Sequence, residues 1–159
     1  MMAGCRRARL LPAIRRGVCG MTVGSWGGKM TNRILAPDTM AAPIGLYSHG
    51  VEVPAGARLI FISGQLGVAP DGTLADGIEA QTDLAWQNMK RVLEAGRMSF
   101  DDMVKVNTFI VDPAHADIVR AVRRRYLPGD QPASTLVAVR AMARPEWLIE
   151  LEGVAAKLD

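Results

Sequence analysis

Two acidic residues near the end of the chain have the spacing that places both side chains on one face of a strand. Glu150 and Glu152 alternate with the apolar Ile149 and Leu151, and successive side chains of a strand point to opposite faces. A carboxylate in a partly apolar pocket can activate a water molecule. Carboxylates on a terminal strand are also common as surface or ion-paired groups, so the pattern leaves both roles open.

Two further polar positions could contribute to such a site. Tyr47 follows the glycine of Ile44-Gly45, where it could act chemically or only pack. Ser63-Gly64 is a small polar step at the end of an apolar strand, and a glycine there lets a ligand approach the backbone closely. Ser63 lacks the G-x-S-x-G elbow, so a serine-hydrolase triad is not expected.

Metal, thiol and cofactor chemistry are not expected in this chain. Both cysteines, Cys5 and Cys19, lie in the first 37 residues, and the two histidines, His49 and His115, do not have a metal-ligand spacing. The sequence contains no phosphate-binding loop and no dinucleotide-binding fingerprint. The sequence therefore gives no motif for a metal or a nucleotide cofactor.

The charge of the chain is unevenly distributed. The 159 residues carry a formal net charge of +3 from 19 basic and 16 acidic residues, but residues 1–37 hold seven of the basic residues and no acidic one. Residues 38–159 therefore have 12 basic and 16 acidic residues, a net charge of −4. Because a nucleic-acid groove needs a basic face, nucleic-acid binding is not expected. No apolar run approaches the roughly 20 residues of a membrane helix, so no membrane partner is expected either.

The elements that would position these residues follow the order ββαβαββ. Hydrophobic periodicity predicts strands over residues 46–53, 58–63, 103–111, 135–142 and 147–155, with helices over 76–95 and 112–126. This pattern indicates a single α+β domain in which two helices cover one face of a sheet.

The second helix carries a run of arginines. Ile118, Val122 and Tyr126 recur at helical spacing and are predicted to form its buried face. Arg120 and the run Arg123 to Arg125 are then expected on a solvated or interface-facing surface.

The last two strands are more apolar than a sheet with one wet face requires. The apolar residues concerned are Leu136, Val137, Val139, Ile149, Leu151 and Val154. A homo-oligomer that buries the second face would account for them.

The first 35 residues are predicted to be a basic extension, with one domain over residues 36–159. We expect the extension to be disordered or to result from a start assigned too early, with Met21 or Met30 as the true start. An organellar presequence fits the acid-free, Arg-rich composition as an alternative, and a secretory signal fits it less well. The expected location is the cytoplasm, or an organellar matrix if residues 1–29 act as a presequence.

Several segments, in this order and spacing, resemble the Rid family of reactive intermediate deaminases, also called the YjgF family. They are Ala42 to Gly50, Ile62 to Gln65, Gln81-Thr82, Gln87-Asn88, Val104 to Val106, Asp112, Gln131 to Ala133 and Ile149 to Glu152. The resemblance implies a chorismate-mutase-like fold and a homotrimer with clefts between subunits. It also implies hydrolysis of reactive imines or enamines of the 2-aminoacrylate class to a ketone and ammonia.

In that scheme Tyr47, Ser63, Gly64 and Glu150 line the cleft, and Glu150 orients or deprotonates the attacking water. The chain departs from the family where deaminating members carry an arginine that clamps the substrate carboxylate, because this position is Ser134. Arg120 is expected to supply the missing charge, or the ligand carries no carboxylate. The function indicated is a cofactor-independent deaminase with an altered substrate. The alternatives are a non-catalytic small-molecule binder and, less favoured, a weak endoribonuclease.

Overall fold

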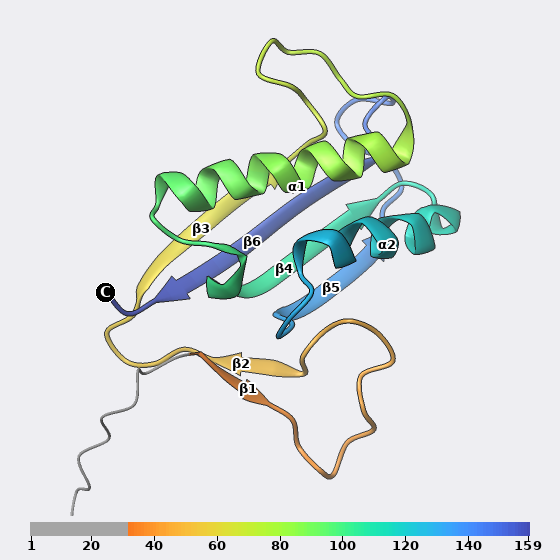
Figure 1. The fold of residues 1–159 in the computed structure, drawn as a ribbon. Coiled ribbons are helices and arrows are strands. Elements are labelled where there is room, and N and C mark those ends of the chain that lie inside the picture. Colours follow the sequence, from red (N-terminus) through yellow and green to blue (C-terminus); the bar gives the residue numbers. More distant parts are fainter. Residues whose placement is uncertain (1–31) are drawn as a thin grey trace, which may run out of the picture.

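The computed structural model describes residues 32–159, and the chain there folds into one sheet with two helices and a separate strand pair. The sheet has the order β3-β6-β4-β5 (Figure 1). Its strands are β3 (Arg58–Gln65), β4 (Met103–Ile110), β5 (Ala133–Ala138) and β6 (Ile149–Lys157). Only β4 and β5 run parallel; β6 is antiparallel to both of its neighbours.

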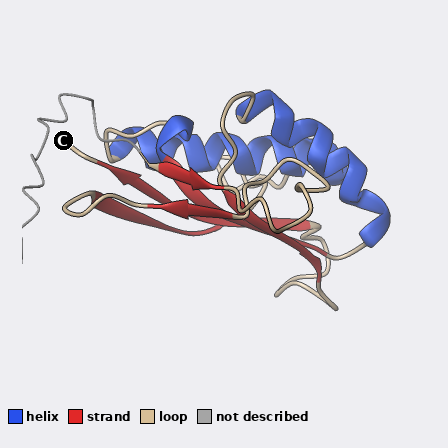
Figure 2. Ribbon diagram, turned by 90° about the horizontal axis from the view of Figure 1, so that it is seen from below, coloured by secondary structure: helices blue, strands red, loops and turns tan. Residues whose placement is uncertain are grey.

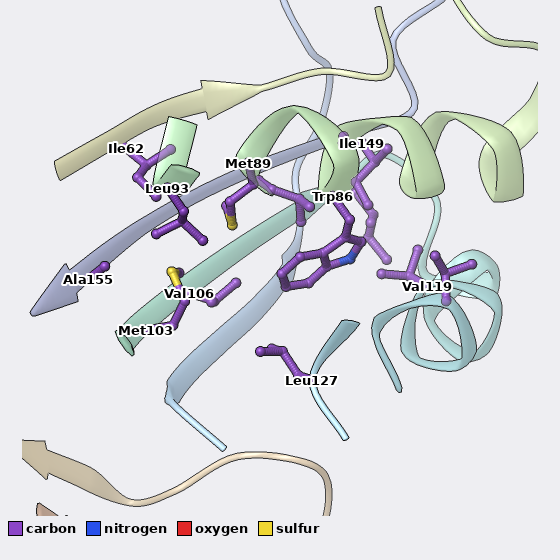
Figure 3. Packing of buried hydrophobic residues seen from close by; sticks show 14 of the residues in the cluster. Ile62, Trp86, Met89, Leu93, Met103, Val106, Val119, Leu127, Ile149 and Ala155 are labelled. Atoms are coloured by element: carbon purple, nitrogen blue, oxygen red, sulfur yellow. The ribbon is translucent and has the colours of Figure 1, made fainter. Parts of the chain in front are cut away.

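Both helices lie on the same face of this sheet (Figure 2). Residues of β4 alternate between buried and half-buried along most of the strand, so the sheet has one covered face and one open face. Val106 and Ile110 are fully buried on the face that the helices cover. The helix α1 (Gly77–Ala95) buries Trp86, Met89 and Leu93 against them (Figure 3). Residues on the opposite side of β4 point to the face that no helix covers.

The second helix packs beside the first through aromatic side chains. A single turn of 3-10 helix, Pro113–His115, leads into α2 (Ala116–Tyr126), and the side chain of Asp112 accepts a hydrogen bond from the backbone N–H of Ala114 (2.8 Å). The predicted start at Asp112-Pro113 is thus confirmed. Tyr126 stacks on Trp86 with ring centroids 5.7 Å apart, which fixes α2 relative to α1.

The expected α+β fold and its order of elements are confirmed, with one extra strand at the start. The strand β1 (Arg33–Leu35) pairs with β2 (Gly50–Glu52) outside the main sheet. The strand predicted over 46–53 is shorter because Ser48 bonds elsewhere: its N–H donates to the carbonyl of Pro132 and its hydroxyl to that of Gln131. The last two strands begin and end within about four residues of their predicted bounds.

Most of the predicted N-terminal extension precedes the first residue that the structure describes. The extension predicted over residues 1–35 falls, apart from 32–35, outside the described residues. No helix within residues 32–159 is long and apolar enough to cross a membrane. The compartment stays a prediction.

The uncovered face of the sheet carries exposed apolar side chains. Phe61 and Leu59 on β3 are 76% and 46% exposed, and Val137 on β5 is 40% exposed. Three residues expected to contribute to this face do not, because Ile149 and Leu151 are fully buried under the helices and Leu136 packs against the core on the helix side. The face is therefore apolar chiefly through β3.

Candidate active site

The sheet separates the predicted site residues into two groups on opposite faces. On the uncovered face, Asn107 Nδ2 donates to Glu152 Oε1 (2.7 Å) and Lys105 Nζ donates to the hydroxyl of Thr135 (2.8 Å). Because side chains alternate along a strand, Glu150 shares this face with Glu152. By the same rule Ser134, which precedes Thr135, points toward the helices.

The first group surrounds a cavity of about 650 Å³ between the helices and the segment before β2. Three of the predicted residues, Tyr47, Arg120 and Ser134, line it. Its other lining residues are Ile44, Gly45, Leu46, Trp86, Thr108, Asp117, Val119, Arg123, Arg124 and Leu136. This volume lies within the range of about 300–1,000 Å³ that is usual for small-molecule pockets.

The residue that reaches Ser134 is Arg123, not Arg120. Nη1 of Arg123 donates to the hydroxyl of Ser134 (2.7 Å), and Nη2 donates to Oε1 of Gln131 (3.4 Å). Arg120 lines the same cavity but pairs with Asp117 (2.9 Å) on the helix surface. The charge in direct contact with Ser134 is therefore that of Arg123, and the role expected of Arg120, which lines the same cavity, stays a prediction.

The buried face of α2 also differs from the prediction. It is formed by Val119, Val122 and Arg123, and Arg123 is only 8% exposed. Ile118, which was expected to be buried, is 39% exposed. The helix is rotated from the predicted orientation because its apolar side is formed by Val119 and Val122. Arg123 lies four residues after Val119, on the same side of the helix, and is therefore buried with them.

The second group consists of Gly64 and Glu150 on the uncovered face. The pairing of β3 with β6 shifts register between Ile62 and Gln65, so Ser63-Gly64 lies at a β-bulge. A Cβ atom built on Gly64 would overlap Oε1 of Glu150. The carboxylate therefore lies directly on the backbone of this glycine, while that of Glu152 is held by Asn107. Ser63 lies beside them on β3, where it is exposed and its carbonyl accepts from Gln65 Nε2 (3.0 Å).

Two amide side chains of α1 fix the loops next to this second group. Asn88 Nδ2 donates to the carbonyls of Leu66 and Val68, in the loop that follows β3. Gln81 Nε2 donates to the carbonyl of Glu146, and its Oε1 accepts from the N–H of Leu148, just before β6. The strand ends that carry Gly64 and Glu150 are therefore held from the helix layer.

The carboxylate on the uncovered face and the hydrogen-bond donors of the cavity could serve one reaction, but within a single chain they lie on opposite faces of the sheet. Glu150 provides a carboxylate that can take a proton from water, beside a backbone that a ligand can approach. The cavity provides hydroxyl and guanidinium donors with apolar walls. Within residues 32–159 no group of three or more metal-ligating side chains is assembled. Arg123 is a buried residue of this cavity that sequence periodicity missed.

Comparison with known proteins gives consistent matches over the same region. The family model described as Endoribonuclease L-PSP matches residues 38–157. Protein HMF1 of Saccharomyces cerevisiae is 40% identical over 114 residues, which is 71% of this chain and 85% of that protein. A 2-iminobutanoate/2-iminopropanoate deaminase of Mus musculus is 28% identical over 127 residues, covering 79% of this chain and 91% of the mouse protein.

Solved structures give the same picture of the fold. The Rid protein YyfB from Yersinia pestis, whose function is described as unknown, superposes with a TM-score of 0.71 at 33% sequence identity. The match covers 79% of this chain and 98% of the Yersinia chain. The similarity therefore includes the strands and helices that position both groups of site residues.

Proposed function

Because the chain belongs to the Rid family, to which the Endoribonuclease L-PSP description applies, we propose that it hydrolyses a reactive imine or enamine to a ketone and ammonia. The observation that carries the proposal is the carboxylate of Glu150 lying on the backbone of Gly64. The deaminase name of the mouse relative supports the reaction class. The substrate is expected to differ from that of the deaminating members because Ser134 replaces their arginine.

The reaction needs one proton acceptor and no redox step. Glu150 takes a proton from water as the oxygen attacks the carbon of the C=N bond, which gives a carbinolamine. The protonated nitrogen then leaves as ammonia, and the oxygen loses its proton to form the ketone, so that one water is consumed for each ammonia released. An enamine first takes a proton on carbon to become the imine. The backbone beside Ser63 and Gly64 holds the substrate during these steps.

We extend the proposal to a homotrimer in which two copies complete each site. The cavity with Tyr47 and Ser134 lies on the helix side of the sheet, whereas Glu150 lies on the uncovered side. The Glu150 of a chain cannot reach its own cavity through the sheet. In the proposed trimer, a second copy places its Glu150 at the mouth of this cavity instead. Burial of Phe61 and Leu59 would favour this association, since exposed apolar area is stabilised by contact.

Replacing Phe61 by Glu should dissociate the oligomer and abolish ammonia release together. The phenyl ring is 76% exposed in the single chain, so the substitution costs the fold of the subunit little. Light scattering should change from the mass of three chains to that of one, with an unchanged far-UV circular dichroism spectrum.

The matched control is Ile34→Glu, at another exposed apolar residue, on β1 outside the main sheet. It should leave both mass and activity unchanged. A wild-type chain that is monomeric at micromolar concentration, or a monomeric Phe61→Glu variant with full activity, would contradict the shared site.

The function itself is tested by ammonia release from imines generated in the assay by an amino-acid oxidase. The wild-type chain should accelerate release from at least one imine, with formation of the matching ketone. If no imine is hydrolysed while a ligand binds the cavity, the non-catalytic binder becomes the better account. Cleavage of RNA in the absence of imine hydrolysis would favour the endoribonuclease instead.

A further inference from the structure

One guanidinium on the helix side of the sheet is buried without an acidic partner. Arg123 is 8% exposed, and its hydrogen-bond partners, Ser134 and Gln131, are both neutral. Burial lowers its pKa to about 10, so it remains charged at neutral pH. A buried charge that is hydrogen-bonded only to neutral groups is costly, and such residues are found where a ligand completes the pairing.

The other charged residues near it on α2 are already paired or exposed. Arg120 pairs with Asp117 (2.9 Å), and Arg125 pairs with Glu79 (2.6 Å) on the helix surface. Among residues 32–159, Asp117 is also the only acidic residue that lines the cavity, and its side chain is 95% exposed. The cavity around Arg123 therefore has a surplus of positive charge.

Unpaired donors gather in the same place. Among the residues described, three buried side-chain nitrogens have no hydrogen-bond partner, and two of them, Nε of Arg123 and Nε1 of Trp86, belong to residues that line this cavity. Trp86 is fully buried, with its indole nitrogen on the side of the ring nearer Val119 of α2 (Figure 3). Leaving a buried donor without an acceptor is unfavourable, so both nitrogens favour a ligand that brings acceptor atoms.

One part of the cavity wall is apolar. Leu46, Val119 and Leu136 line it together with Ile44, whose side chain is 98% exposed. A ligand with acceptor oxygens at one end and a branched or aromatic hydrocarbon group at the other matches both parts of the wall.

We propose that Arg123 is the anion-binding residue of this cavity and holds the carboxylate of a ligand whose remaining part is apolar. Anion binding by Arg123 follows from the structure whether or not hydrolysis occurs. Together with the proposed function, on which this second statement rests, it names the substrate class: an imine or enamine acid with a branched or aromatic side chain. Arg123 would then act from α2, while Ser134 orients its guanidinium through the 2.7 Å hydrogen bond.

The binding test uses 4-methyl-2-oxopentanoate, the keto acid that such a reaction releases, and its neutral counterpart 4-methyl-2-pentanone. Calorimetric titration of the wild-type full chain should show binding of the keto acid at least tenfold tighter than of the ketone. Arg123→Gln should remove this preference, and Arg123→Lys, which keeps the charge, should retain part of it. Arg125→Gln, on the same helix but not in the lining of the cavity, is the matched control and should change the affinity less than threefold.

Thermal unfolding separates a binding role from a structural one. If Arg123 serves a ligand, its buried charge destabilises the empty chain, so Arg123→Gln should melt at the same temperature as the wild type or higher. The keto acid should raise the melting temperature of the wild type and leave that of Arg123→Gln unchanged. A variant that melts several degrees lower, together with unchanged keto-acid binding, would make Arg123 a structural residue and overturn the proposal.

Turnover distinguishes this inference from the proposed function. Imines derived from leucine and phenylalanine should be hydrolysed with a KM at least tenfold higher in Arg123→Gln, and kcat should change less. Keto-acid binding that depends on Arg123, without turnover of any imine, would reject only the hydrolase. Turnover with a KM that does not depend on Arg123 would reject only the carboxylate site.

Discussion

Replacing Glu150 by Gln should lower kcat for imine hydrolysis by about 10²–10⁴-fold, the range for loss of a general base. The amide has the same shape and can still lie on Gly64, but it cannot accept the proton from the attacking water. KM should change little, because the carboxylate of the substrate is expected to bind in the cavity on the helix side. The measurement is steady-state ammonia release at several substrate concentrations.

Glu152→Gln is the matched control on the same strand and the same face. Its carboxylate is already engaged by Asn107 at 2.7 Å, so its replacement should alter kcat less than fivefold. A Glu150→Gln variant within threefold of wild type would remove Glu150 from the mechanism, and equal losses in both variants would indicate a general effect of charge on this face.

Adding one methyl group at Gly64 should lower kcat by about 10²-fold, the effect expected when a catalytic group moves by about 1 Å. A Cβ at this position overlaps Oε1 of Glu150, so Gly64→Ala must displace the carboxylate from the backbone. Gly64 is exposed and its φ is not positive, so the substitution should alter the melting temperature by no more than a few degrees. Activity and thermal unfolding are measured on the same preparation.

Gly129→Ala provides the control for the introduction of a methyl group. A Cβ there would meet no atom within 4 Å, so activity and stability should both match the wild type. If Gly64→Ala retained full kcat, the position of the Glu150 carboxylate on this backbone would not matter to the reaction. If it unfolded the chain, the glycine would be required by the bulge of β3 and not by the site.

The periodicity of the strands and of α1 was sufficient to predict the fold. Alternation along β4 and the helical spacing of Met89 and Leu93 on α1 determine which sides are buried, and the strand and helix predicted there are confirmed. Alternation also placed Glu150 opposite Ile149, as the structure confirms. The spacing of apolar residues predicts these elements because buried side chains recur every second residue in a strand and every three to four residues in a helix.

The interior of the cavity could not be predicted in the same way. Helical spacing assigns α2 a buried face from its apolar residues alone, so a buried arginine is counted as surface. The buried position of Arg123 becomes visible only in three dimensions, where β5 pairs with β4 and Ser134 lies within hydrogen-bond distance of the guanidinium. The serine at position 134 was visible in the sequence, but the guanidinium of Arg123 that donates to its hydroxyl was not.

The central claim is that imine hydrolysis occurs at a site to which two copies contribute opposite faces of their sheets. It is tested most directly by mixing two inactive variants, Glu150→Gln and Tyr47→Ala, which alter different halves of that site. Co-expressed in equal amounts and purified as the random mixture of all oligomers, they should regain about one quarter of wild-type ammonia release, because each random pair of neighbours has that chance of supplying two intact halves. Mixed oligomers that release no more ammonia than either variant alone would contradict the shared site.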